Sequence, residues 1–160
     1  MVLIPIRRAG DPVLRQKARR VRTRDSSLGK LIDDMFETMY HAEGIGLAAN
    51  QVGILRQVLV IDTRDEVNPA AGRLALVNPR IVAVTDELDR ASEACLSLPG
   101  LEEVVERPWG VCVEGFDPQG SPVSVDAEAL PSRVIQHEID HLEGILFIDY
   151  LSKLKKSMIV

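Results

Sequence analysis

The stretch QHEIDHLEG, residues 136–144, carries the pattern that decides the fold and the chemistry of this chain. His137 and His141 are four residues apart, so on a helix they lie on one face, one turn apart. Two imidazoles placed in this way can bind one metal ion from the same side. Glu138 is rotated by about 100° around the helix axis from His137, which puts its carboxylate beside the metal position, where a general base is needed. The stretch therefore predicts a metal-binding helix with its own acid/base group.

A third metal ligand has to come from another part of the chain, because a catalytic metal keeps about three protein ligands and one open position. No histidine follows His141, and Phe147 stands where the extended metalloprotease pattern has its third histidine. A thiolate is therefore the favoured ligand. Cys112 lies in a strand pattern, which is typical of a buried apolar side chain. Cys95 is followed by turn-forming residues that allow it to face a cleft. We predict Cys95 as the third ligand, and a thiolate with two imidazoles suits Zn²⁺ or Fe²⁺.

Outside this stretch, the sequence predicts a cluster of strands in the middle of the chain, preceded by one helix and followed by another. An apolar stripe of 3.6-residue period begins after Ser26 and ends near Gly44, and the motif helix is expected from near Pro131 to Leu142. Strands are expected at residues 57–61, 74–77 and 81–84, and as a hairpin of 110–116 with 122–125. This order predicts an α+β fold of mostly antiparallel sheets, packed around a central helix that carries the His-Glu-x-x-His motif.

Composition and charge exclude several other classes of protein. The 160 residues, 46% of them hydrophobic, suit a single domain over residues 1–160. No apolar run reaches the roughly 18 residues of a membrane helix, and the N-terminus does not read as a secretory signal. With only two cysteines, we expect a reduced, cytoplasmic protein without membrane association. The net charge of -5 argues against direct sequence-specific nucleic-acid binding.

A local basic segment departs from that acidic balance. Six of the ten residues from Arg15 to Arg24 are basic and none is acidic. Such a run is most typical of a solvated face. The alternative interpretation is a docking site for an anionic partner such as ribosomal RNA.

The segment GIGLAANQ, residues 44–51, joins the first predicted helix to the next strand. Gly44 and Gly46 allow close approach of another part of the chain to this backbone. Gln51 ends the segment with a side-chain amide that can donate a hydrogen bond to a developing oxyanion. Taken alone, the segment is more typical of a simple turn of small residues.

Three separated blocks together resemble one known family. GIGLAANQ (44–51), EACLS (93–97) and QHEIDH (136–141) occur in the order and at the separations typical of the peptide deformylases. VNP at 77–79 and GILF at 144–147 extend the resemblance over nearly the whole chain. The resemblance implies a metal-dependent hydrolase of protein biosynthesis. Its reaction is removal of the N-terminal formyl group from the N-formylmethionine of nascent polypeptides, with release of formate.

Roles for individual residues also follow from the resemblance. A divalent metal, in the family typically Fe²⁺ with Zn²⁺ as a common substitute, would be held by Cys95, His137 and His141. Glu138 would handle the proton of the attacking water. Gln51 and the backbone N–H of Leu96 would stabilise the oxyanion. The backbone of Gly46 would bond to the peptide, and Ile45 and Val134 would help to form the pocket for the methionine side chain. The resemblance implies the nascent chain as substrate and the ribosome surface as a further partner.

One position departs from the family pattern. The family usually has glycine before the cysteine, and this chain has Ala94. If this position needs a positive φ, alanine costs about 1 kcal/mol and shifts the loop. Two other functions remain as alternatives: a zinc peptidase, which the helix motif alone would suit, and a non-catalytic, metal-stabilised binding module with a closed four-ligand site.

Overall fold

The computed structural model describes residues 2–22 and 26–159. Its helices are η1 (Pro12–Arg15), α1 (Ser26–His41), η2 (Ala49–Val52), α2 (Pro69–Gly72), α3 (Ala129–Leu142), η3 (Phe147–Tyr150) and α4 (Lys153–Ser157), where η marks a 3-10 helix. Its strands are β1 (Gly46–Ala48), β2 (Val58–Asp62), β3 (Arg73–Val84), β4 (Leu88–Cys95), β5 (Leu98–Pro108), β6 (Gly110–Phe116) and β7 (Pro122–Glu128).

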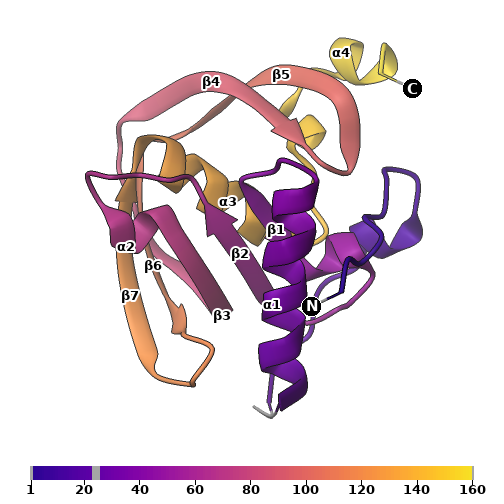
Figure 1. Cartoon of the computed structure of the whole chain (residues 1–160). Helices are drawn as coiled ribbons and strands as arrows, with labels where there is room; N and C mark the ends of the chain where they lie inside the picture. Colours follow the sequence, from indigo (N-terminus) through magenta and orange to yellow (C-terminus); the bar gives the residue numbers. More distant parts are fainter. Residues whose placement is uncertain (1, 23–25, 160) are drawn as a thin grey trace.

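The strands form two antiparallel sheets. Five strands make the larger sheet, in the order β1-β2-β3-β6-β7, and β4 pairs with β5 in a separate hairpin. In Figure 1 this hairpin arches across the top of the molecule, above α3. The predicted α+β fold with mostly antiparallel sheets is confirmed.

The larger sheet is covered by a helix on each face, and β2 shows how the sequence achieves this. Val58 and Val60 pack in the cluster that contains the apolar stripe of α1, whereas Leu59 and Ile61 pack with α3. Successive side chains of a strand point to opposite faces, so a continuous apolar run is needed where both faces are covered. In Figure 1, α1 stands in front of the sheet.

The motif helix α3 lies between the two sheets. It packs against β1, β2, β6 and β7 of the larger sheet and against β5 of the hairpin. Both histidines of the motif and Glu138 are consequently buried. The motif side chains are therefore enclosed between the two sheets, so a further metal ligand has to come from a segment that packs against α3.

One expected pair of strands is instead a single strand. Short strands on either side of Asn78-Pro79 were predicted, but β3 continues through this point with a shift in its pairing between Val77 and Arg80. Asn78 has φ 51°, and its side chain accepts a hydrogen bond from the N–H of Val21 at 2.8 Å and donates one to the Val21 carbonyl at 3.0 Å. The local irregularity serves to anchor the N-terminal segment on the sheet.

The basic segment can be followed only in part, because Thr23, Arg24 and Asp25 lie outside the described residues. Its basic side chains from Arg15 to Arg22 are all exposed. As for membranes, no helix in the described part of the chain is long and apolar enough to cross one.

Candidate active site

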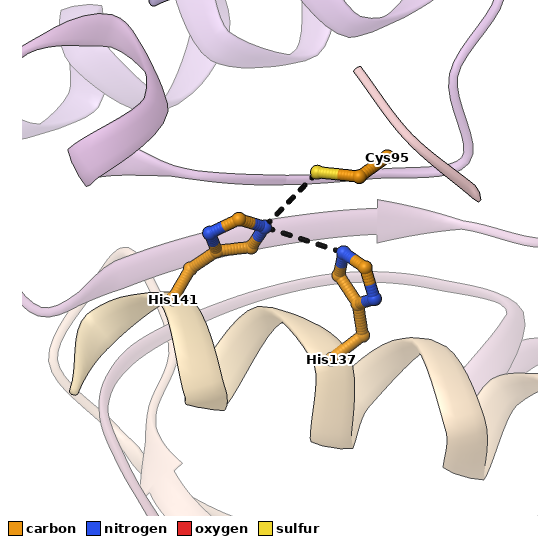
Figure 2. A group of neighbouring side chains, drawn as sticks. All are labelled: Cys95, His137 and His141. Atoms are coloured by element: carbon orange, nitrogen blue, oxygen red, sulfur yellow. Dashed lines mark hydrogen bonds between the residues drawn. The ribbon is translucent and has the colours of Figure 1, made fainter. Parts of the chain in front are cut away.

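Cys95, His137 and His141 meet at one point between β4 and α3. Sγ of Cys95 lies 3.3 Å from Nε2 of His141, which lies 3.2 Å from Nε2 of His137. Figure 2 shows both rings standing on one face of the helix with the thiol across from them. All three side chains are buried, and their ligand atoms lie within 4.8 Å of one another. The three residues predicted as metal ligands are therefore brought together.

Hydrogen bonds around His137 leave its inner nitrogen available to a metal. Its Nδ1 lies 2.9 Å from Oε1 of Glu93. Burial raises the pKa of Glu93, but hydrogen bonds from His137 and Arg107 outweigh this and lower the pKa to about 2. An ionised carboxylate only accepts hydrogen bonds, so Nδ1 carries the proton and Nε2 presents a lone pair.

The donor set as a whole fits a divalent cation. Lone pairs of sulfur and nitrogen converge in a buried space, which is unfavourable unless a cation lies among them. Oε1 of Glu138 is also buried without a hydrogen-bond partner among the described residues. A thiolate with two imidazoles is a typical set for Zn²⁺ or Fe²⁺.

Glycine at position 46 lets β1 pass close to the motif helix. A Cβ built on Gly46 would lie 2.5 Å from Oε2 of Glu138 and 2.8 Å from Cγ1 of Val134. Gly44 likewise leaves room for the side chain of Leu96. The two glycines are therefore needed because larger residues would clash with Glu138, Val134 or Leu96. The sequence alone could not tell this requirement from that of a simple turn.

Glu138 lies in an environment suited to proton transfer. Burial is the main cause that raises its pKa, to about 7. A carboxyl group with a pKa near the working pH can both accept and return a proton.

The side-chain amide of Gln51 is held in one orientation. Its Oε1 accepts a hydrogen bond from the N–H of Ala48 at 2.9 Å, so the amide nitrogen must point the other way. There Nε2 lies 3.1 Å from Oγ of Ser97 and 3.6 Å from Sγ of Cys95. The predicted oxyanion donor therefore faces the ligand cluster.

A cavity of about 570 Å³ opens beside the ligands. Its walls include all the residues predicted to contact substrate or oxyanion: Ile45, Gly46, Gln51, Leu96 and Val134. Leu130, which sequence reasoning did not select, lines it too and is 48% exposed. The size lies within the range of small-ligand and peptide side-chain pockets.

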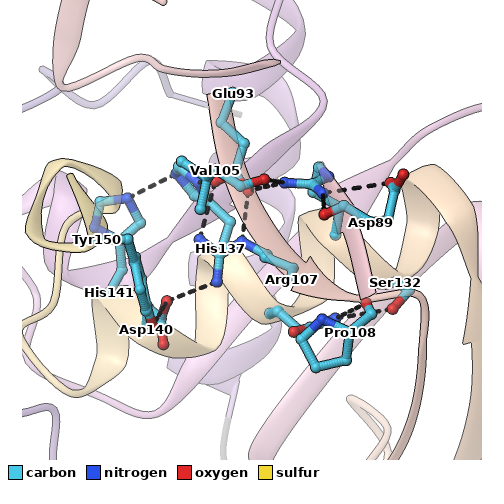
Figure 3. A network of polar contacts seen from close by, with 12 residues as sticks. Asp89, Glu93, Val105, Arg107, Pro108, Ser132, His137, Asp140, His141 and Tyr150 are labelled. Carbon is cyan, nitrogen blue, oxygen red and sulfur yellow. Dashed lines mark hydrogen bonds and ion pairs between the residues drawn. The ribbon is translucent and has the colours of Figure 1, made fainter. Parts of the chain in front are cut away.

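A buried network of charges behind the ligands was missed at the sequence level. Glu93 accepts hydrogen bonds from Nε and a terminal nitrogen of Arg107 at 2.5 and 2.9 Å, as Figure 3 shows. It accepts a further one from Arg133 at 2.6 Å. Arg107 also bonds to Asp140 at 2.9 Å. One sequence signal could have revealed Glu93. It precedes Cys95 by two residues, and residues two apart on a strand lie on the same face.

Two positions at which the sequence departs from a known motif have a clear structural setting. Phe147, where a third histidine would stand in a metalloprotease, is buried and stacks on the ring of His137 with the centroids 5.9 Å apart. Ala94 is not among the described non-glycine residues with positive φ, so the strain expected from alanine does not arise. Within residues 2–22 and 26–159, the group of side chains that could hold a metal ion consists of Cys95, His137 and His141, without Glu138.

Comparisons with known proteins agree with the geometry. The family model described as "Polypeptide deformylase" matches residues 3–157. A peptide deformylase of Rhizobium meliloti is 45% identical over 160 residues, which cover 100% of this chain and 91% of the relative. A crystal structure of a peptide deformylase from Legionella pneumophila superposes with a TM-score of 0.90 at 41% identity, covering 99% of this chain and 91% of that one. One from Ehrlichia chaffeensis in complex with actinonin gives a TM-score of 0.94 at 36% identity, covering 99% and 94%.

These matches extend over the whole length of the fold and include the helix, the cysteine loop and the glycine segment that build the site. The chain therefore belongs to the polypeptide deformylase family, metal-dependent enzymes that remove the N-terminal formyl group from nascent polypeptides.

Proposed function

We propose that Cys95, His137 and His141 hold one divalent metal ion, Fe²⁺ as the resident metal with Zn²⁺ as its substitute, and that the chain uses it for deformylation. The convergence of the three ligand atoms within 4.8 Å is the observation that carries the proposal. An ion of this kind, when bound, acts as a Lewis acid and activates water as a nucleophile.

Glu138 moves the proton in this scheme. Its buried carboxylate has one oxygen without a protein partner and a pKa raised to about 7 by burial. It can therefore take a proton from the attacking water and deliver it to the amine that leaves when the C–N bond breaks.

Gln51 and Leu96 stabilise the negative charge that develops on the formyl oxygen. The Gln51 amide is fixed by Ala48 with its N–H groups toward the ligand cluster. The backbone N–H of Leu96 is the second donor, from the turn that follows the cysteine. One fixed donor of this type is worth about 2.7–4 kcal/mol in other hydrolases.

The cavity beside the ligands receives the N-formylmethionine residue. Val134 and Ile45 give its wall an apolar contact for the methionine side chain. Among the described strands, β1 pairs with β2 alone and is an edge strand of the larger sheet. The backbone of Gly46 can thus hydrogen-bond to an extended nascent chain, as edge strands do in peptide recognition.

We place the protein in the cytoplasm, at the ribosome surface where nascent chains emerge. The exposed basic side chains from Arg15 to Arg22 support docking to an anionic surface. Co-sedimentation with ribosomes at rising salt tests this: binding that is not weakened by salt, or that survives reversal of these charges, contradicts it.

The central experiment measures formate release from a formyl-Met peptide by protein prepared with Fe²⁺ without oxygen. Glu138→Ala should abolish most of the turnover while metal content stays constant, and Cys95→Ser should lose metal. Cys112→Ser is the matched control, because Cys112 is the only other thiol and lies outside the ligand set. Inactive parent protein, or a fully active Glu138→Ala variant, refutes the proposal.

A further inference from the structure

Tyr150 lies at the surface end of a polar chain that leads to the metal site. It is the last residue of η3 and is half exposed. Its hydroxyl donates a hydrogen bond to Oδ2 of Asp140 at 2.8 Å. Burial, followed by this bond to Asp140, raises the pKa of Tyr150 to about 12, so the hydroxyl remains a donor throughout the physiological range.

Tyr150 also covers a buried cation. The guanidinium of Arg107 lies 5.0 Å from the centre of the Tyr150 ring. The Arg107 side chain is only 5% exposed. The same Asp140 oxygen that accepts from Tyr150 accepts from Arg107 at 2.9 Å. The ring therefore shields the Arg107–Asp140 pair from water, and its hydroxyl keeps the carboxylate turned toward the guanidinium.

From Arg107 the chain of bonds continues inward to a metal ligand. Two nitrogens of Arg107 bond to the two oxygens of Glu93, and Glu93 bonds to Nδ1 of His137. Figure 3 shows the sequence of contacts from Tyr150 and Asp140 through Arg107 to Glu93 and His137. By contrast, Nδ1 of His141 is buried without a hydrogen-bond partner among the described residues. Only His137 is oriented through such a network.

We propose that Tyr150 is a positioning residue for the metal centre: through Asp140, Arg107 and Glu93 it holds the ring of His137 so that Nε2 faces the metal. The inference rests on the metal site proposed above. Without the hydroxyl, Asp140 turns toward water and Arg107 loses part of one anchor, which loosens the forked contact with Glu93. Arg133 still holds Glu93 from its other side, so the effect is partial.

The chain offers a matched control in its only other tyrosine. The Tyr40 hydroxyl donates to Asp62 at 2.6 Å, and the contacts of Tyr40 with Phe36 and Arg73 do not lead to a metal ligand. Tyr40→Phe thus removes the same kind of bond from another place. Tyr150→Phe keeps the ring over Arg107 and removes only the hydroxyl.

The experiment measures the Zn²⁺ dissociation constant by chelator competition, and the ring tautomer of His137 in metal-free protein by ¹⁵N NMR. Loss of a group that orients a metal ligand typically weakens binding about 10–100-fold, which we expect for Glu93→Gln. For Tyr150→Phe, further along the chain, we expect about 3–10-fold weaker binding and a larger share of the wrong tautomer. Tyr40→Phe should match the wild type.

A double variant tests the path itself. If Tyr150 acts through Asp140, then Tyr150→Phe combined with Asp140→Asn should bind Zn²⁺ no more weakly than Asp140→Asn alone. Three results would overturn the inference and leave the metal site standing. They are additive losses in the double variant, equal effects of Tyr150→Phe and Tyr40→Phe, and a Tyr150→Phe variant that matches the wild type while Glu93→Gln is impaired. Wild-type protein that binds no Zn²⁺ through Cys95, His137 and His141 would overturn both.

Discussion

Replacing Gly46 by alanine adds one methyl group between β1 and α3 and should displace the carboxylate of Glu138. Gly46 is not among the residues with positive φ, so alanine fits its backbone. The added Cβ would lie 2.5 Å from Oε2 of Glu138, whereas ordinary contact begins at 3.4 Å. The carboxylate must therefore move by about 0.9 Å, and a misplacement of this order costs about 100-fold in rate. We expect kcat to fall about 100-fold.

Formate release, metal content and urea unfolding should be measured on the same preparation. Metal content should stay at the parent level, because the methyl group meets Glu138 and Val134 rather than a ligand. Overpacking should lower the free energy of unfolding by about 1–3 kcal/mol. Gly29→Ala is the control: its Cβ meets nothing within 4 Å, so activity should not change and α1 should gain up to about 1 kcal/mol. A folded, metal-loaded Gly46→Ala variant with parental kcat would refute the role given to Glu138.

Three further outcomes are expected. Gln51→Leu should lower kcat roughly 100- to 1,000-fold with metal retained, since it removes a fixed oxyanion donor; an unchanged kcat would exclude that role. Asn78→Ala should lower the free energy of unfolding by roughly 2–4 kcal/mol, because it loses both bonds to Val21 and places alanine at φ 51°; a loss below about 0.5 kcal/mol in urea unfolding would contradict this. Burial raises the pKa of Asp149, but bonds from Arg15 and a backbone N–H lower it overall. The carboxylate therefore stabilises the fold above its unfolded pKa of about 4, and this is lost as pH falls through the folded value. Asp149→Asn should be less stable than wild type by about 1 kcal/mol at pH 7, and this difference should shrink as pH falls below the unfolded pKa; a difference that does not depend on pH would exclude the ion pair as the cause.

How far the fold could be predicted depended on what each element buries. α1 carries an apolar stripe of helical period and β2 is a continuous apolar run, so the hydrophobic pattern located both. α3 was located instead by the proline at its start and the glycine just past its end. The β4–β5 hairpin was not predicted, because Glu93 and Arg107 on it are buried as ion-paired charges. A search for periodic hydrophobicity treats charged residues as exposed, so it does not detect strands that bury them.

The candidate site, too, could be predicted only in part. Cys95 could be selected because so few thiols and imidazoles exist in the chain, and the structure brings its sulfur to the two histidines. Arg107 and Asp140 could not be selected, because Arg107 reaches Glu93 and Asp140 only where different elements pack together. No sequence spacing marks contacts of this kind.

The proposed metal ligands come from two separate segments, so a bound ion would also affect the stability of the fold. An ion held by Cys95 at the end of β4 and by His137 on α3 closes a loop of about 42 residues, as a disulfide would. A covalent cross-link over such a loop removes about 4 kcal/mol of chain entropy from the unfolded state. The ion should therefore act as a reversible cross-link between hairpin and helix. Chelation should lower the melting temperature together with activity, and the hairpin should be the first segment to exchange its amide hydrogens.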